Sequence, residues 1–178
     1  ALELDGRTIL QATVRDITER KQTEQQIHRL AFFDALTNLP NRRALDERLE
    51  IEVQRARRFN HPFAVVMMDL DGFKAVNDTY NHTVGDQVLE SVARAVSEVV
   101  RVDELVARRG GDEFFVLFGD ADVAMSDSVV ERLGDAVKHS RMRICPDLTP
   151  TASIGVVTWQ AGQSADDFMH AADLVMHD

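Results

Sequence analysis

The clearest pattern in the chain is a set of apolar positions that recur at strand or helix spacing. Residues 63–70 form a nearly continuous apolar run after Pro62, which is typical of a buried strand. Residues 83–100 place valines along one helical face, while 105–109 and 113–118 are apolar segments joined by a glycine turn, which indicates a hairpin. The other predicted elements are helices at about 41–58, 73–80, 126–139 and from Ser164 onward, with a strand region at 149–159. This order predicts an α/β sandwich with a mostly antiparallel sheet.

The first 33 residues lack this globular pattern. Residues 8–14 resemble a short strand for which no partner strand is visible nearby. Residues 17–31 are polar and have helical composition, with few apolar side chains. Two interpretations of this helix remain open: a solvated connecting helix, or a short two-stranded coil that brings two copies together.

Composition narrows the class of protein. The chain has 178 residues, of which 44% are hydrophobic and 28% charged, so most of it should fold into a core. Its net charge of −10 argues against a nucleic-acid partner, because duplex binding needs a basic footprint. The single cysteine, Cys145, cannot form an internal disulfide and favours a reducing compartment. The longest apolar run is too short to cross a bilayer, and we expect a cytoplasmic protein, with membrane anchoring left open for upstream segments.

Carboxylates at turns are the candidates for chemistry. Asp69-Leu70-Asp71-Gly72 follows the first core strand, and alternation places Asp69 and Asp71 on one face of it. The hairpin turn carries the string Gly110-Gly111-Asp112-Glu113, in which two glycines allow a ligand to approach the backbone closely. Hard oxygens at strand ends suit Mg²⁺ together with substrate phosphates. From the residues alone, ordinary turn chemistry explains the same strings, and both interpretations stay open.

Several motifs in order resemble one family. Residues 110–114 spell GGDEF, and the chain resembles the diguanylate cyclase family that is named after this string. The segments that accompany it are Asp34-Ala-Leu-Thr-Asn-Leu-Pro-Asn-Arg, Asp69-Leu-Asp-Gly-Phe-Lys, Asn77-Asp78, His82-x-x-Gly-Asp86 and Ala152-Ser-Ile-Gly-Val. The resemblance covers 34–178. It implies a ferredoxin-like fold with a mostly antiparallel five-stranded central sheet flanked by helices, related to the polymerase palm and to class III nucleotide cyclases.

The resemblance also implies a reaction and its catalytic residues. The family condenses two GTP molecules into cyclic di-GMP and releases pyrophosphate; each domain holds one GTP, so a homodimer is needed. Asp69, the Leu70 carbonyl and Asp112 are then the implied ligands of Mg²⁺, for which Mn²⁺ is an alternative. Asp112, Glu113 and Lys74 are the implied catalytic residues; Asp112 would also help to deprotonate the 3′-hydroxyl, while Glu113 adjoins the metal.

The remaining implied roles concern the nucleotide. Phe73 and Lys74 occupy the family's phosphate-binding segment, and Gly110 and Gly111 leave room for the α-phosphate. Asn77 and Asp86 match the residues that bind guanine, whose edge suits a carboxylate acceptor and an amide. Each has an alternative. Asp86 follows Thr83 by three residues and could complete a capping box, Asn77 could be a polar residue at a helix end, and Asp71 is expected to serve the turn rather than the metal.

Three departures from the family pattern stand out. The inhibitory product site R-x-x-D has its counterpart in Arg101-Val-Asp-Glu104, so product inhibition through Arg101 and Glu104 is in question. Arg109 stands where the family often has an aromatic residue, and a surface position would explain it. His177 takes another aromatic position near the C-terminus, and the phosphate-contacting lysine expected just beyond it does not occur in the sequence.

The N-terminal segment carries a second resemblance. Gly6-Arg7 and the string Arg15-Asp-Ile-Thr-Glu-Arg-Lys resemble the end of a PAS sensor domain and its exit helix. We therefore expect the end of a PAS-like domain at 1–16, a signalling linker helix at 17–33 and a cyclase domain at 34–178, incomplete at its C-terminal end. The main hypothesis is a sensor-regulated diguanylate cyclase. The alternatives are a degenerate domain that binds GTP or cyclic di-GMP and regulates an attached phosphodiesterase domain, and a purely structural dimerisation module.

Overall fold

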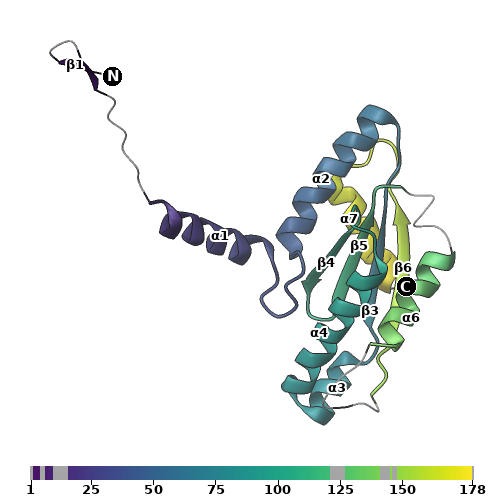
Figure 1. Ribbon diagram of the computed structural model, residues 1–178. Coiled ribbons are helices and arrows are strands. Elements are labelled where there is room, and N and C mark those ends of the chain that lie inside the picture. Colours follow the sequence, from purple (N-terminus) through teal and green to yellow (C-terminus); the bar gives the residue numbers. More distant parts are fainter. Residues whose placement is uncertain are drawn as a thin grey trace. The chain divides into compact units, whose positions relative to one another are not determined.

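Two compact units make up the chain, Ala1–Ala31 and Phe32–Asp178. They are drawn in Figure 1, a computed structural model. The structure describes residues 2–4, 7–9, 16–120, 127–140, 145 and 148–177. None of the described helices combines the length and the apolar character that crossing a membrane requires.

The first unit contains a small hairpin and most of a polar helix. Strands β1 (Leu2–Leu4) and β2 (Arg7–Ile9) pair antiparallel. The predicted strand at 8–14 is therefore wrong in its start and in having no partner, because residues 2–4 supply one; residues 10–14 lie outside the described residues. Helix α1 (Thr18–Phe32) confirms the predicted polar helix, and its side chains Ile27 and Leu30 are exposed.

The second unit follows the predicted order of elements. Asn41 caps the first helix of this unit, and its side chain accepts a hydrogen bond from the Ala44 backbone N–H. Ser164 and Asp167 likewise form a reciprocal capping pair at the start of the last helix. The elements are α2 (Arg42–Phe59), β3 (Ala64–Leu70), α3 (Phe73–Tyr80), α4 (His82–Val99), β4 (Leu105–Gly110), β5 (Glu113–Phe118), α6 (Asp127–Lys138), β6 (Ala152–Thr158) and α7 (Ala165–His177).

The central sheet is antiparallel throughout and has the strand order β4-β5-β3-β6. The α/β class and the helix-flanked antiparallel sheet are confirmed. The expected five strands are wrong for the described residues, which form four strands in this sheet. The apolar pattern of this unit contains four strand segments, and the fifth was expected from the family resemblance alone. Strand β3 lies in the interior of the sheet, so its C-terminal end is flanked by β5 on one side and β6 on the other.

Alternation along β3 divides the core into two layers. Val66 and Met68 belong to the cluster that packs against α4 and α6, while Val65 and Met67 belong to the cluster that packs against α2 and α7. Helices therefore cover both faces of the sheet, as Figure 1 shows. Because every side chain from Ala64 to Met68 is buried, β3 reads as a continuous apolar run, and the chain becomes polar only at its end. The polar end of β3 therefore follows a segment that is packed on both faces of the sheet.

Candidate functional site

Two carboxylates face each other where the central strands end. Asp69, the penultimate residue of β3, lies directly opposite Glu113 on β5 and opposite Ser153 on β6. Directly opposed residues of antiparallel strands have their side chains on one face and their Cβ atoms about 5 Å apart. Both carboxylate residues are half-buried. The register therefore brings together two acidic residues that are 44 positions apart in the sequence.

The turn beside this pair has an unusual backbone conformation. Gly110 has φ 156° and Gly111 has φ 53°, and a register shift separates Arg108 from Gly110 where the turn begins. A side chain at Gly111 would be strained by its left-handed φ. A Cβ at either glycine would meet no atom within 4 Å, so the tip borders open space. Asp112 follows immediately and is half-buried, which places its carboxyl group at the same end of the sheet as Asp69.

The donor set at this end of the sheet fits a hard divalent cation. Asp69, Asp112 and the Leu70 carbonyl all supply oxygen, which is what Mg²⁺ prefers. Within the described residues, three or more His, Cys, Asp or Glu side chains do not gather into a ready metal-binding group. A site with only two carboxylates suits Mg²⁺ all the same, because this ion usually takes the rest of its ligands from water and substrate phosphates.

Helix α3 begins next to the carboxylates. Gly72 precedes it with φ 65° and provides no side-chain cap, and the first helical hydrogen bond runs from the Val76 N–H to the Gly72 carbonyl. The N–H groups of Phe73 and Lys74 thus have no partner within the helix, as in the first turn of any helix. Such an end attracts anions, phosphate above all. Phe73 is half-buried against the core and Lys74 is exposed.

The two predicted guanine-binding residues lie where α3 and α4 meet. Asn77 on α3 packs against Gly85 on α4 so closely that a Cβ at Gly85 would overlap the Asn77 side-chain oxygen. Asp86 is the next residue of α4 and is exposed. Gly85 itself is buried, so the absence of a side chain there is what lets Asn77 occupy its place. The structure therefore places Asn77 and Asp86 on two adjacent helices, with Asp86 next in sequence to the glycine against which Asn77 packs.

The capping-box alternative for Asp86 is wrong. Asn81, with φ 80°, is the N-cap of α4, and its Oδ1 accepts hydrogen bonds from the backbone N–H groups of Thr83 and Val84 at 2.9 and 3.4 Å. Thr83 consequently lies inside the helix and does not cap it. Asp86 is thereby left without the capping role that the spacing suggested.

The pair Arg101 and Glu104 lies at the other end of β4 from the glycine turn. The Glu104 carboxylate accepts a hydrogen bond of 2.8 Å from the backbone N–H of Arg101, and the Glu104 N–H returns one to the Arg101 carbonyl. Glu104 therefore closes a local turn. The exposed Arg101 side chain makes no ion pair with Glu104 in the described part of the chain.

Asp71 joins the ends of two strands. Its carboxylate accepts hydrogen bonds from the hydroxyl groups of Thr151 at 2.6 Å and Ser153 at 2.8 Å, and its backbone N–H donates to the Thr151 carbonyl at 2.9 Å. The bonds from Thr151 and then Ser153 hold the pKa of Asp71 below its usual value. Asp71 thus ties the start of β6 to the end of β3, in keeping with the expectation that it serves the turn.

Replacing Asp71 with alanine should destabilise the protein by about 1 kcal/mol near neutral pH, because two hydrogen bonds to an exposed carboxylate are lost. A lowered folded-state pKa makes this contribution complete above the unfolded pKa of about 3.9 and removes it as the pH falls through the folded value. Urea unfolding at neutral pH and at about pH 3.5 should therefore show a difference that narrows in acid. Asp78→Ala, on an exposed position of α3, is the control; an equal loss there would contradict the role of Asp71.

Arg108 is a site residue for which the sequence suggested no role. Its guanidinium donates to the Gly111 carbonyl through Nε at 3.0 Å and Nη2 at 2.7 Å, and to Asp34 through Nη1 at 2.8 Å. Burial raises the pKa of Asp34, but hydrogen bonds from Thr37 and Arg108 outweigh it and leave that pKa below its usual value. The one available signal was the pair of arginines, Arg108 and Arg109, at the end of a strand that begins apolar.

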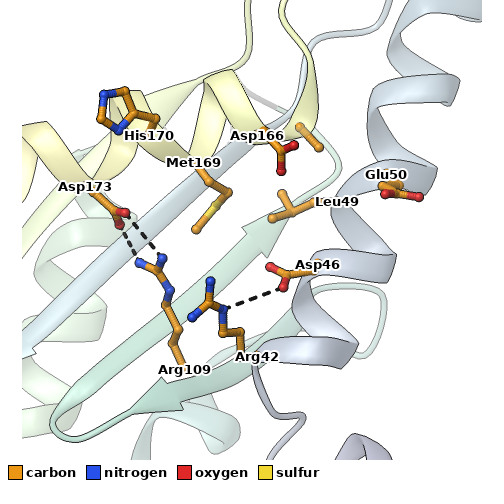
Figure 2. Close-up of a pocket in the computed structure, with 10 residues that line it drawn as sticks. Arg42, Asp46, Leu49, Glu50, Arg109, Asp166, Met169, His170 and Asp173 are labelled. Atoms are coloured by element: carbon orange, nitrogen blue, oxygen red, sulfur yellow. Dashed lines mark hydrogen bonds and ion pairs between the residues drawn. The ribbon is translucent and has the colours of Figure 1, made fainter.

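A pocket of about 400 Å³ lies between α2 and α7. Figure 2 shows Arg109 and Asp173 pointing toward each other across it, with Arg42 near Asp46. Hydrogen bonding to Asp173 holds the pKa of Arg109 above its usual value, and the guanidinium also lies over the Phe115 ring. Arg109 is therefore a half-buried residue that ties α7 to β4, and the expectation of a surface position is wrong. The side chain of His177 lies outside the described residues.

Comparison with known proteins identifies the family. Residues 31–178 match the diguanylate cyclase GGDEF domain family, and the chain belongs to this family. The chain is 38% identical over 175 residues to the bifunctional diguanylate cyclase/cyclic di-GMP phosphodiesterase MucR of Pseudomonas aeruginosa, covering 98% of this chain and 25% of MucR. It is 37% identical over 163 residues to the cyclic di-GMP phosphodiesterase PdeR of Escherichia coli, covering 91% and 24%. The chain thus spans about a quarter of the length of these curated relatives.

Solved structures give the same result for the fold. The coiled coil and GGDEF domain of DgcB from Caulobacter crescentus, in complex with c-di-GMP, superposes with a TM-score of 0.80 at 28% identity, covering 90% of this chain and 86% of that one. The diguanylate cyclase SiaD from Pseudomonas aeruginosa, in complex with its activator SiaC, superposes with a TM-score of 0.78 at 35% identity, covering 91% and 65%.

Proposed function

We propose that this chain contains a diguanylate cyclase domain that condenses two GTP molecules into cyclic di-GMP. The observation that carries the proposal is the register that sets Asp69 opposite Glu113, beside an open glycine turn that ends in Asp112. Membership of the family supports the same reaction. In each of two steps, the 3′-oxygen of one nucleotide forms a bond to the α-phosphorus of the other. The bond from that phosphorus to pyrophosphate breaks, and the hydroxyl proton is removed.

The residues at the sheet end would hold the reacting groups. Asp69, Asp112 and the Leu70 carbonyl would bind Mg²⁺, or Mn²⁺ in its place, which would neutralise the triphosphate and stabilise the departing pyrophosphate. Asp112 would also help to accept the proton of the 3′-hydroxyl, with Glu113 beside it. The glycine turn leaves space for the α-phosphate, because neither glycine has an atom within 4 Å of its Cβ position.

The helices beside the sheet would bind the rest of the nucleotide. The N–H groups of Phe73 and Lys74 at the uncapped start of α3 suit the phosphates, and the Lys74 ammonium adds a positive charge. Asp86 would accept hydrogen bonds from the guanine N1–H and amino group, while the Asn77 amide would meet another polar atom of the base. Adenine would leave these groups unpaired, so the site would favour guanine.

Catalysis would require two copies of the chain. Each domain holds one GTP, so the 3′-hydroxyl of one substrate reaches the α-phosphate of the other only when two domains face each other. The polar helix α1 would bring the domains together under the control of an N-terminal PAS-like sensor. In this proposal the whole protein is cytoplasmic in its catalytic part and binds GTP and cyclic di-GMP. A product-inhibition site at Arg101 and Glu104 would show as binding of cyclic di-GMP in calorimetry that weakens in Arg101→Ala.

A second candidate is a domain that binds GTP or cyclic di-GMP without turnover and regulates an attached phosphodiesterase. The observation in its favour is the similarity to PdeR, which is named as a cyclic di-GMP phosphodiesterase alone, whereas MucR is named as both a diguanylate cyclase and a phosphodiesterase. Only the first candidate, the cyclase, would convert GTP into cyclic di-GMP.

Incubating the 178-residue chain with GTP and Mg²⁺ distinguishes the two candidates. The cyclase predicts cyclic di-GMP and pyrophosphate in a ratio of one to two, with a rate that rises more than linearly with protein concentration because a dimer forms. The regulatory domain predicts nucleotide binding by calorimetry and no product. Equal binding of ATP and GTP would contradict the guanine-binding roles of Asn77 and Asp86.

A further inference from the structure

The side chain of Arg108 joins two segments that are far apart in the sequence. Its guanidinium donates hydrogen bonds to the Gly111 carbonyl from two nitrogens and to the Asp34 carboxylate from the third, with donor–acceptor distances between 2.7 and 3.0 Å. Only 11% of this side chain is exposed. A guanidinium that is enclosed and donates hydrogen bonds from all three of its nitrogens is fixed in position, because the planar group can no longer turn freely.

The Asp34 end of this connection is rigid as well. The backbone N–H and the hydroxyl of Thr37 both donate to Asp34 Oδ1, at 2.8 and 2.7 Å, and the Asp34 N–H donates to the Leu39 carbonyl at 2.8 Å. The backbone N–H of Arg108 also donates to the Pro40 carbonyl at 2.9 Å. Residues 34–40 therefore form a compact turn that is bonded to β4, and this turn starts two residues after α1 ends.

The glycine turn, by contrast, has few constraints of its own. Gly110 and Gly111 adopt positive φ values, and beyond the adjoining residues of the chain no atom lies within 4 Å of either Cβ position. Glycine has the widest conformational freedom of all residues, so a pair of them leaves the direction of the chain poorly determined. The Gly111 carbonyl belongs to the same planar peptide unit as the Asp112 nitrogen. Whatever fixes this carbonyl therefore also fixes the direction in which Asp112 leaves the turn.

We propose that Arg108 is a positioning residue that aims the Asp112 carboxylate by holding the Gly111–Asp112 peptide plane. Asp34 holds Arg108 in turn, so the segment that follows α1 sets the geometry of the metal-binding turn. The proposal rests on the proposed function only in that Asp112 is taken as a metal ligand. The connection between Asp34, Arg108 and the turn stands on the contacts themselves.

Three variants of the full 178-residue chain test the proposal. Arg108→Lys keeps the charge but cannot span the Gly111 carbonyl and Asp34 together. Asp34→Asn keeps an oxygen for Thr37 while it removes the charge that attracts Arg108, and it is the milder change if Arg108→Lys does not fold. Arg109→Gln is the matched control: it removes the neighbouring ion pair, to Asp173, and has no contact with the Gly111 carbonyl.

The first readout is hydrogen exchange of the backbone amides at 110–113, measured beside the global unfolding free energy. We expect exchange to be faster by about ten-fold or more in Arg108→Lys, by a smaller factor in Asp34→Asn, and unchanged in Arg109→Gln. The second readout is Mn²⁺ affinity by electron paramagnetic resonance, with a GTP analogue that cannot release pyrophosphate. It should weaken about ten-fold in Arg108→Lys and remain at the wild-type value in Arg109→Gln.

The outcomes separate this proposal from the proposed function. Unchanged exchange at 110–113 in a folded Arg108→Lys variant would overturn the positioning role. Faster exchange with unchanged Mn²⁺ affinity would overturn it too, because the contact would then be structural only. If Asp34→Asn leaves the exchange unchanged, the link to the segment after α1 is wrong. A wild-type chain that binds no Mn²⁺ would refute the proposed metal site, and the exchange data would still decide whether Arg108 and Asp34 hold the turn.

Discussion

Asp112→Asn should reduce cyclic di-GMP formation by about a hundred- to a thousand-fold and leave the fold intact. Asparagine has nearly the same shape as aspartate but no charge, and Asp112 is only half-buried in a turn that borders open space. The substitution therefore removes one of the two proposed carboxylate ligands without disturbing the core. With that ligand neutral, the cation is held less tightly, and the proton of the 3′-hydroxyl loses its proposed acceptor.

Chromatographic measurement of cyclic di-GMP at saturating GTP and Mg²⁺ would follow this loss. Thermal unfolding by circular dichroism would show that the variant is folded. Asp135→Asn makes the same chemical change on the exposed face of α6, away from the glycine turn, and should retain wild-type turnover. An Asp112→Asn variant that keeps more than about a tenth of the wild-type rate would remove this residue from the reaction.

The second large effect is expected from Gly85→Ala. Alanine is favoured over glycine in a helix by about 1 kcal/mol, so helix α4 by itself should gain stability. Its Cβ, however, would overlap the side-chain oxygen of Asn77 and lie 3.0 Å from the Asn77 Cγ, and the Phe73 Cζ at 3.3 Å would have to shift slightly. The end of the Asn77 side chain can rotate away, so the fold should survive while the proposed guanine contact is lost. GTP affinity should fall at least about ten-fold, with an unfolding temperature that stays the same or rises.

A second helical glycine supplies the control for this experiment. At Gly134 on α6 a Cβ would lie 3.6 Å from the Ile154 Cδ1, which is ordinary van der Waals contact, so Gly134→Ala should leave GTP affinity unchanged. Calorimetry with a GTP analogue that is not turned over gives the affinities. The double variant Gly85→Ala/Asn77→Ala should bind no more weakly than Asn77→Ala alone, because both changes remove the same contact. Additive losses would mean that Gly85 acts on the nucleotide by another route.

Local patterns in the sequence were enough for most of the fold. The apolar run before Asp69 and the two segments around Gly110-Gly111 predicted the strands that meet at the site, because alternation and turn chemistry are short-range properties. The cap of α4 was misplaced: Thr83 and Asn81 are both common N-cap residue types, and spacing alone does not decide at which of them the helix begins. The partner of β2 was also missed, since β1 is only three residues long.

Contacts between distant residues could not be predicted in the same way. The bond between Arg108 and Asp34 joins positions 74 residues apart, and the register of Asp69 with Glu113 depends on how β3 and β5 pair. Neither has a local signal, because each follows from the arrangement of whole strands. The same holds for Gly85, whose importance is visible only when α3 lies against α4.

The proposed site residues lie on two different parts of the fold, the helices α3 and α4 and the glycine turn, and this has an evolutionary consequence. The proposed guanine-binding residues, Asn77 and Asp86, lie on α3 and α4, whereas the proposed metal ligand Asp112 lies in the glycine turn between β4 and β5. Asp112 stands in an exposed turn, where a substitution has little effect on folding. Descendants of such a domain can therefore lose turnover in a single mutational step and keep a nucleotide pocket. A single substitution then separates an enzyme from a domain that only binds the nucleotide.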